Sequence, residues 1–127
     1  MEMFQNAVNW VEIPVLNFDR AKSFYSKIYD FEMPEMMMGP LRMGFLLFDQ
    51  EKGGVGAAIV QGETYVPSVQ GLKVYLNGGQ DLNTVLDRVS SAGGKIILPK
   101  TAINPELGFM AIFQDSEGNQ IYVHSHN

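Results

Sequence analysis

The 127-residue sequence contains no cysteine. Without thiols the chain cannot form disulfides, thiolate zinc sites or iron–sulfur clusters, and it offers no cysteine nucleophile. The phosphate-binding patterns G-x-x-x-x-G-K-[ST] and G-x-G-x-x-G are also missing, as is the G-x-S-x-G elbow of serine hydrolases. Phosphate-binding loops and acyl transfer are therefore not expected.

Long apolar runs and basic clusters are missing too. No stretch of about 18 apolar residues exists, and the opening MEMFQNAVNW lacks the basic-then-apolar order of a secretory signal. Nine Lys and Arg against 14 Asp and Glu give a formal net charge of −5, which repels phosphate backbones. We expect a single cytoplasmic domain, 1–127, that binds neither nucleic acid nor membrane.

The first half of the chain predicts one strand, one helix and three further strands. Residues 8–15 alternate as a half-buried strand does, and Asn17 is a candidate N-cap. Three strands then follow, separated by glycine-containing turns, at 31–37, 43–48 and 55–60. The apolar positions of the helix recur at i, i+3, i+4 and i+7, namely Ala21, Phe24, Tyr25 and Ile28.

The second half repeats this order. Leu72, Val74 and Leu76 predict a strand, and Asp81 is placed to cap a helix that stops at 92–94. Three strands follow at 95–98, 109–113 and 120–124. The apolar residues of the helix are Leu82, Val85, Leu86 and Val89.

A constant offset of 61 residues relates the two halves, which predicts an internal duplication. The repeats cover about 8–61 and 70–124. Each repeat has one helix for one face of a four-stranded sheet, so the other face needs the second repeat, a partner chain or a ligand. The seven apolar pairs at this offset are Val11–Leu72, Ile13–Val74, Val15–Leu76, Ala21–Leu82, Phe24–Val85, Tyr25–Leu86 and Ile28–Val89.

Several motifs in this order resemble the vicinal oxygen chelate superfamily, which includes glyoxalase I, extradiol dioxygenases and bleomycin-resistance proteins. The motifs are EIPV at 12–15, RAKSFY at 20–25, AGGK at 92–95 and FQDSEGNQI at 113–121. The resemblance implies an α+β fold in which two tandem βαβββ repeats form a cup-shaped mixed sheet. It fixes no single activity, because one scaffold serves isomerases, oxygenases and drug binders.

Metal-dependent members of the family hold a divalent ion with His, Glu or Gln from the first and last strands of each repeat. Those positions fall on Trp10, Gly71 and Tyr122, with only Gln61 near the fourth. Because a lone Gln holds no ion, we expect no family-type metal and no cofactor. The alternative is one divalent metal at a shifted site that uses Glu12 and His124.

By strand parity, six side chains are expected to face the cup: Trp10, Glu12, Lys73, Tyr75, Tyr122 and His124. Glu12 has two possible roles. It is a general base or polar anchor, in which case burial would disfavour its charged form, or it forms a structural ion pair with Lys73 or His124. Trp10, Tyr75 and Tyr122 either belong to the hydrophobic core or offer rings on which a flat ligand stacks. Five methionines between 33 and 43 read as packing or as a pliable ligand wall.

Three functional hypotheses follow. The first is a metal-free protein that binds a small apolar or aromatic molecule in the cup, with Glu12, Lys73 and His124 fixing its polar end. The second is a lyase or isomerase in which Glu12 or His124 moves a proton next to a carbonyl. The third is a fold that serves assembly alone, and the exposed sheet faces make a homodimer the expected state in each case.

Overall fold

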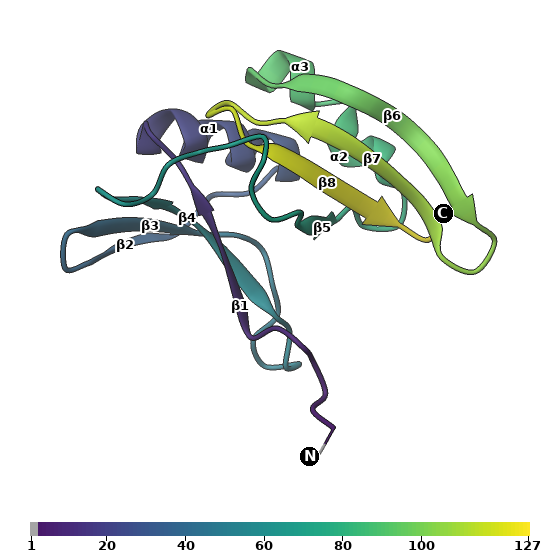
Figure 1. Ribbon diagram of the computed structural model, residues 1–127, viewed down its shortest axis with the longest axis horizontal. Helices are drawn as coiled ribbons and strands as arrows, with labels where there is room; N and C mark the ends of the chain where they lie inside the picture. The colour runs from purple at the N-terminus through teal and green to yellow at the C-terminus, as the bar shows by residue number, and fades with distance from the viewer. Residues whose placement is uncertain (1–2) are drawn as a thin grey trace.

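The computed structural model describes residues 3–127 and has an α+β architecture with two four-stranded mixed sheets (Figure 1). The first sheet comprises β1 (Trp10–Pro14), β2 (Glu35–Met38), β3 (Leu41–Phe45) and β4 (Gly56–Gln61), in the order β1-β4-β3-β2. The second comprises β5 (Tyr75–Asn77), β6 (Lys95–Asn104), β7 (Gly108–Gln114) and β8 (Gln120–Ser125), in the order β5-β8-β7-β6.

Both sheets have the same topology, which confirms the predicted pair of βαβββ repeats. In each, the first and last strands of the repeat pair in parallel and the remaining pairs are antiparallel. The strands do not join into one sheet, because β1 and β5 each have a neighbour on one side only. These two edges flank the candidate site described below.

The helix of the first repeat, α1 (Phe18–Tyr29), forms as predicted. The Asn17 side chain accepts a hydrogen bond from the Arg20 backbone N–H at 3.1 Å, so it caps the helix. The helix ends at Asp30, whose φ of 51° lies in the left-handed region. Its apolar stripe is buried: Phe18, Ala21, Phe24, Tyr25 and Ile28.

The helix predicted for the second repeat is divided into two short helices, α2 (Asn83–Leu86) and α3 (Val89–Ala92). Asp81 accepts a hydrogen bond from the Asn83 N–H at 2.9 Å, but it is not the N-cap that the sequence predicted, because Leu82 occupies that position without a capping side-chain bond. Between the helices the Arg88 N–H bonds three residues back to Val85, which tightens the turn and interrupts the α pattern. Gly93, with φ of 105°, ends α3 where the stop was predicted.

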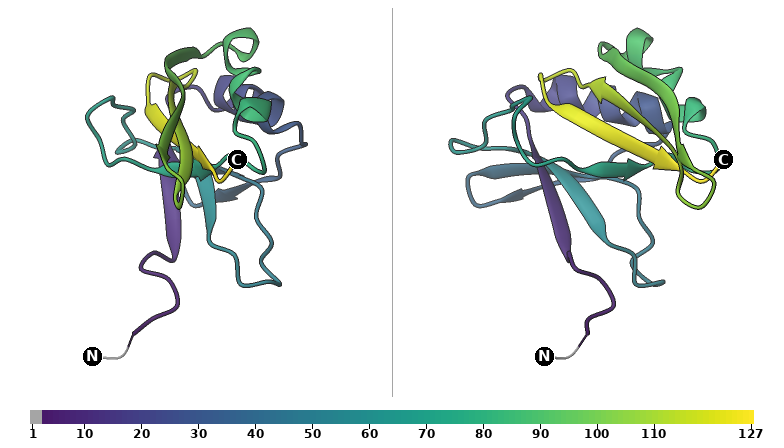
Figure 2. Two further views of the ribbon diagram at one scale, coloured as in Figure 1. Left: turned by 90° about the vertical axis from the view of Figure 1, so that its right-hand side faces the viewer. Right: turned by 45° about the vertical axis from the view of Figure 1, so that its right-hand side comes forward.

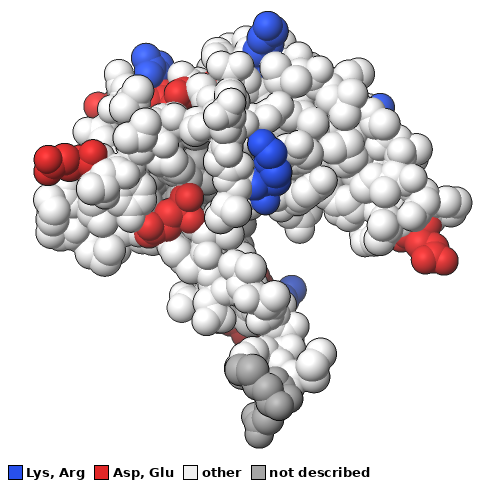
Figure 3. All heavy atoms as spheres, viewed as in Figure 1, with Lys and Arg blue, Asp and Glu red and all other residues white. Residues whose placement is uncertain are grey.

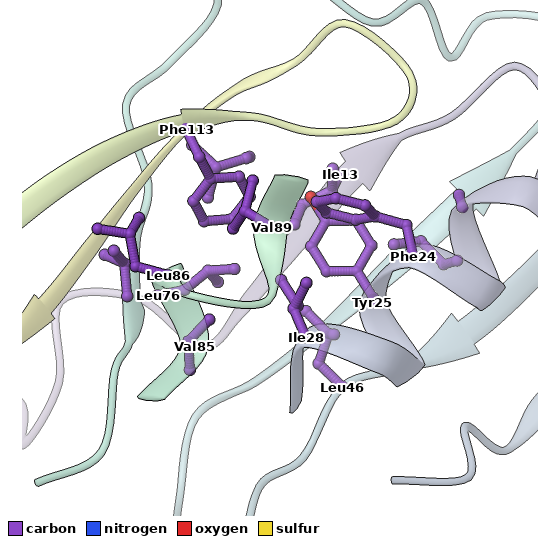
Figure 4. Close-up of a cluster of buried hydrophobic side chains, with 14 of the residues drawn as sticks. Ile13, Phe24, Tyr25, Ile28, Leu46, Leu76, Val85, Leu86, Val89 and Phe113 are labelled. Atoms are coloured by element: carbon purple, nitrogen blue, oxygen red, sulfur yellow. The ribbon is translucent and has the colours of Figure 1, made fainter. Parts of the chain in front are cut away.

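One hydrophobic core joins the two repeats. The three helices lie next to one another on the same side of the β5–β8 sheet (Figure 2). Phe24, Tyr25 and Ile28 of α1 pack in the same cluster as Val89 of α3 and Phe113 of β7 (Figure 4). On the opposite face of the first sheet, Met43, Ala58 and Val60 form a second, smaller buried cluster, against which Tyr65 of the following segment packs.

The predicted match between residues 61 positions apart does not hold for the first pair, Val11 and Leu72. Leu72 is 99% exposed, although its mate Val11 is half-buried. The reason is that the backbone joins β8 only from Val74 onward, where the Val74 carbonyl accepts from the Tyr122 N–H at 3.0 Å. Residues before Val74 belong instead to the connection 62–74 between the two repeats.

The methionine-rich segment divides between two roles. Met33 and Met43 are 2% and 4% exposed and belong to hydrophobic clusters. Residues 36–38 lie on β2, the edge of the first sheet, and all three methionines there are about half exposed or more. Within residues 3–127 no helix is long and apolar enough to cross a membrane.

Candidate functional site: the cleft between β1 and β5

A cleft of about 660 Å³ lies between the edge strands β1 and β5, beside the connection 62–74. Its volume falls in the range of about 300 to 1,000 Å³ common for small-molecule sites. Its walls come from β1, the connection, β5 and the start of β8: Val8, Trp10, Val11, Glu12, Ile13, Pro14, Val66, Ser68, Gly71, Leu72, Lys73, Val74, Tyr75, Asn119, Gln120 and Ile121. The lining is largely apolar and carries only two charged side chains.

Glu12 is one of these charged residues. The sequence predicted that its side chain would be buried, but it is exposed. Side chains alternate along β1, so Glu12 lies on the open face of the strand while Ile13 points into the core. The Tyr65 hydroxyl of the connection donates to Glu12 Oε1 at 2.6 Å, and this hydrogen bond raises the pKa of Tyr65. The expected ion pair with Lys73 or His124 does not form within residues 3–127.

Lys73 is the second charged residue of the cleft. Its ammonium group donates to the backbone carbonyl of Val69 at 3.1 Å, within the connection. This hydrogen bond ties the ammonium group to the connection. The cleft thus carries one carboxylate, on β1, and one ammonium group, on the connection.

Trp10 packs against other apolar side chains and also lines the cleft, and these are the two roles that the sequence left open. It is 36% exposed and lines the cleft, and its ring packs against Phe45 at 6.1 Å and Phe48 at 5.8 Å between centroids. Gly56 makes this packing possible, because a Cβ there would lie 2.5 Å from atoms of both the Trp10 and Phe48 rings. We call Trp10, Phe45 and Phe48 the aromatic shelf.

Phe45 and Phe48 support Trp10 from outside the cleft lining, and the sequence analysis did not identify them. Phe45 reaches Trp10 across β4, because it pairs with Ala58, which in turn pairs with Glu12. Parity along β3 could have placed Phe45 on the open face. Its neighbours depend on the register of three strands, which one sequence does not fix.

The remaining predicted residues come from β5 and β8. Tyr75 is 54% exposed and lines the cleft, and its ring lies 4.8 Å from that of Tyr122, which is not part of the lining. His124 also lies outside the lining. Its Nε2 is 2.5 Å from the Leu107 carbonyl at the tip of the β6–β7 hairpin, and its ring contacts His126. Of the six predicted residues, the structure thus brings together Trp10, Glu12, Lys73 and Tyr75.

The acidic turn between β7 and β8 joins the repeats, and its last residue, Asn119, also lines the cleft. Glu117 has a side chain with no exposed surface, and it accepts from the Leu16 and Asn17 N–H groups at 2.9 and 2.7 Å. It also accepts from Arg20 Nε at 2.6 Å and from the Ser116 hydroxyl at 3.1 Å. Burial opposes its charge, but these hydrogen bonds outweigh burial, so the pKa of Glu117 lies below its ordinary value.

Asp115 and Asn119 extend the same network. The buried Tyr25 hydroxyl donates to Asp115 Oδ2 at 2.7 Å, and burial, followed by the Asp115 charge, raises the pKa of Tyr25 well above its ordinary value. The Asn119 amide donates to the Pro14 carbonyl at 2.7 Å, while its oxygen accepts from the Ser68 N–H at 3.1 Å. The turn thereby fixes β1, α1 and the connection around the cleft.

The residues at the family's metal-binding positions do not fit a divalent ion. Gly71 offers no side chain, Trp10 and Tyr122 are not usual ligands, and Gln61 Oε1 already accepts from the Phe18 N–H at 2.6 Å. The shifted pair also fails as a ligand set, since Glu12 lines the cleft and His124 does not. In the part of the chain that the structure describes, no three His, Cys, Asp or Glu residues form a metal-binding group.

The fold and the cleft define a two-repeat α+β protein with a small-molecule-sized cavity between its repeats. The family model of the Glyoxalase/Bleomycin resistance protein/Dioxygenase superfamily matches residues 7–123, and the chain belongs to this superfamily. A glyoxylase-like domain-containing protein from Didymella fabae is 25% identical over 114 residues, which cover 88% of each chain.

Two solved structures show the same fold. An antibiotic-binding protein from a Streptomyces species has a TM-score of 0.66 and 22% identity, with 98% of both chains covered. A glyoxalase I variant from Zea mays has a TM-score of 0.70 and 14% identity over 94% of this chain. This chain spans only 44% of the length of that maize protein.

Proposed function

We propose that this protein binds a small apolar or aromatic molecule in the cleft between β1 and β5, without a family-type metal. The cleft itself carries the proposal: about 660 Å³ of space with a mostly apolar lining and two charged side chains, Glu12 and Lys73. Such a site gains affinity from apolar contact and orientation from its few polar groups. The fold shared with an antibiotic-binding protein agrees with this function.

The single tryptophan makes the proposal directly testable, because Trp10 lines the cleft and is the only source of indole fluorescence in the chain. The neutral dye N-phenyl-1-naphthylamine accepts energy from tryptophan and brightens in apolar surroundings. We expect saturable dye binding with quenching of Trp10, and about tenfold weaker binding by Tyr75→Ala, which removes an aromatic ring from the cleft wall.

The matched control is Leu107→Ala, an exposed apolar residue outside the cleft lining. This variant should bind the dye as the unmodified protein does. Equal weakening by both variants would show that the dye adheres to apolar surface in general, and an absence of saturable binding would contradict the proposed function itself.

A second candidate is an enzyme of the lyase or isomerase kind. The hydrogen bond from the Tyr65 hydroxyl to the exposed Glu12 carboxylate favours it, because a base that lines the cleft then lies next to a proton donor. In deuterated water such an enzyme would exchange a C–H proton next to the carbonyl of a bound ketone, as followed by proton NMR. Glu12→Gln should abolish this exchange, whereas exchange that is unchanged in the variant would exclude Glu12 as the base.

We also propose that two copies of the chain associate. The open face of the first sheet carries Met36 and Met38, each 49% exposed, in register with Met43 and Leu41. An apolar face of this kind is commonly covered by a partner. Light scattering after size exclusion should give twice the chain mass of 14.2 kDa, and Met38→Glu should lower it toward one chain. A monomeric mass for the unmodified protein would contradict association.

A further inference from the structure

We propose that the ligand of this cleft is an organic cation: a protonated amine or quaternary ammonium group on a flat apolar body, held by Glu12 and the Trp10 ring. The inference rests on the proposed function, since it names the ligand class of the same cleft. It goes further by assigning recognition of the charge to one carboxylate and one indole ring, which Phe45 and Phe48 support from outside the lining.

The strand register brings the carboxylate and the rings to one patch of sheet. Trp10 and Glu12 are two residues apart on the same face of β1, a separation of about 7 Å along the strand. Glu12 and Phe45 stand on either side of Ala58, because each is its partner in the register. Gly56 and Ala58 are buried beneath these larger side chains, which therefore form the surface of the patch.

The charges around this patch favour a positive ligand group. Within residues 3–127, Glu12 has no Lys, Arg or His partner within ion-pair distance, and the neutral Tyr65 hydroxyl that donates to it leaves its negative charge in place. Lys73, the other charged residue of the cleft, donates to the Val69 carbonyl. The face viewed in Figure 3 is mostly uncharged, and its charged side chains stand apart from one another.

Aromatic rings add to this preference, because the negative face of an indole or phenyl ring attracts a cation. Trp10 lines the cleft and is 36% exposed, so a ligand in the cleft can reach its ring. An anion would be repelled by Glu12, and a neutral molecule would gain only apolar contact. The apolar body of a cationic ligand would extend along the cleft toward Tyr75, which lies on the far wall.

Two probes of nearly the same shape separate charge from apolar contact. Benzyltrimethylammonium carries a quaternary nitrogen, and neopentylbenzene has a carbon atom in its place. Each is titrated against Trp10 fluorescence, with N-acetyltryptophanamide as the correction for collisional quenching. We expect the cation to bind about tenfold more tightly than its neutral analogue at low salt, and this advantage to shrink in 0.5 M NaCl.

Glu12→Gln should remove most of the advantage, bringing the affinity for the cation to within about threefold of the neutral probe without changing the latter. Glu63→Gln is the matched control, because it removes an exposed charge from the connection at a residue outside the cleft lining. Its affinity for the cation should change less than twofold.

The outcomes distinguish the two proposals. Equal affinities for the cation and its neutral analogue, or a cation affinity that Glu12→Gln leaves unchanged, would overturn the cation assignment while binding in the cleft still stands. Failure of both probes to bind would overturn the cation assignment and the proposed function together.

Discussion

Replacing Glu117 by glutamine should destabilise the fold by about 2 to 3 kcal/mol. The substitution keeps the size of the side chain but removes the charge that strengthens its hydrogen bonds from the Leu16 and Asn17 N–H groups, at about 1 kcal/mol each. It also turns an amide N–H₂ toward the Arg20 guanidinium. That loss is small, about 0.5 to 1 kcal/mol, because the Arg20 side chain is 53% exposed and solvent screens it.

Urea unfolding followed by circular dichroism measures this change. With a slope of about 1 to 2 kcal/mol per molar urea, the midpoint should fall by about 1 to 3 M. The control is Glu35→Gln, whose carboxylate pairs with Arg42 and Lys22 at a partly exposed position and should cost less than about 1 kcal/mol. Equal midpoint shifts in the two variants would refute the claim that the buried Glu117 network joins the repeats.

The same prediction has a pH dependence with a definite sign. The pKa of Glu117 is lower in the folded protein than in the unfolded chain, where it is about 4.3. Its contribution to stability is therefore complete above that value and is lost as the pH falls through the folded pKa. The stability difference between the unmodified protein and Glu117→Gln should be constant from pH 7 to 5 and shrink below pH 4. A difference that grows in acid would contradict the direction of this shift.

Two further substitutions test the core network and the aromatic shelf. Tyr25→Phe removes the buried hydroxyl that donates to Asp115, so urea unfolding should show a loss of about 1 to 2 kcal/mol; an unchanged midpoint would mean that this hydrogen bond contributes nothing. Gly56→Ala places a Cβ against the rings of Trp10 and Phe48, so it should shift the Trp10 emission maximum and weaken dye binding several-fold; an unaltered spectrum would show that the rings do not lie over position 56.

Much of the fold could be predicted because it depends on local patterns and on their repetition. The Asn17 cap, the apolar stripe of α1 and the stop at Gly93 all formed as their residue types indicate. The exposed Leu72 and the division of the second helix were not predicted, since each depends on where the backbone finds its hydrogen-bond partners. Strand parity alone gives no information on where pairing with β8 begins.

The candidate site was predicted less completely than the fold. Parity along β1 correctly placed Trp10 and Glu12 on the open face, but it could not show that the carboxylate stays exposed beside Tyr65. Tyr65 comes from the connection between the repeats, a segment with no periodic pattern to locate it. His124 has the correct parity but lies too far along β8, where it contacts the hairpin tip.

The central claim is that a small molecule occupies the cleft between β1 and β5, and mapping by nitrogen-15 NMR tests it most directly. Titration with benzyltrimethylammonium should move the Trp10 indole signal and the amide signals of residues 10–13 and 71–75 along saturable curves. Amide signals at the hairpin tip, residues 104–107, should stay in place. Shifts that are confined to the hairpin tip, or that spread over the surface without saturating, would contradict the claim.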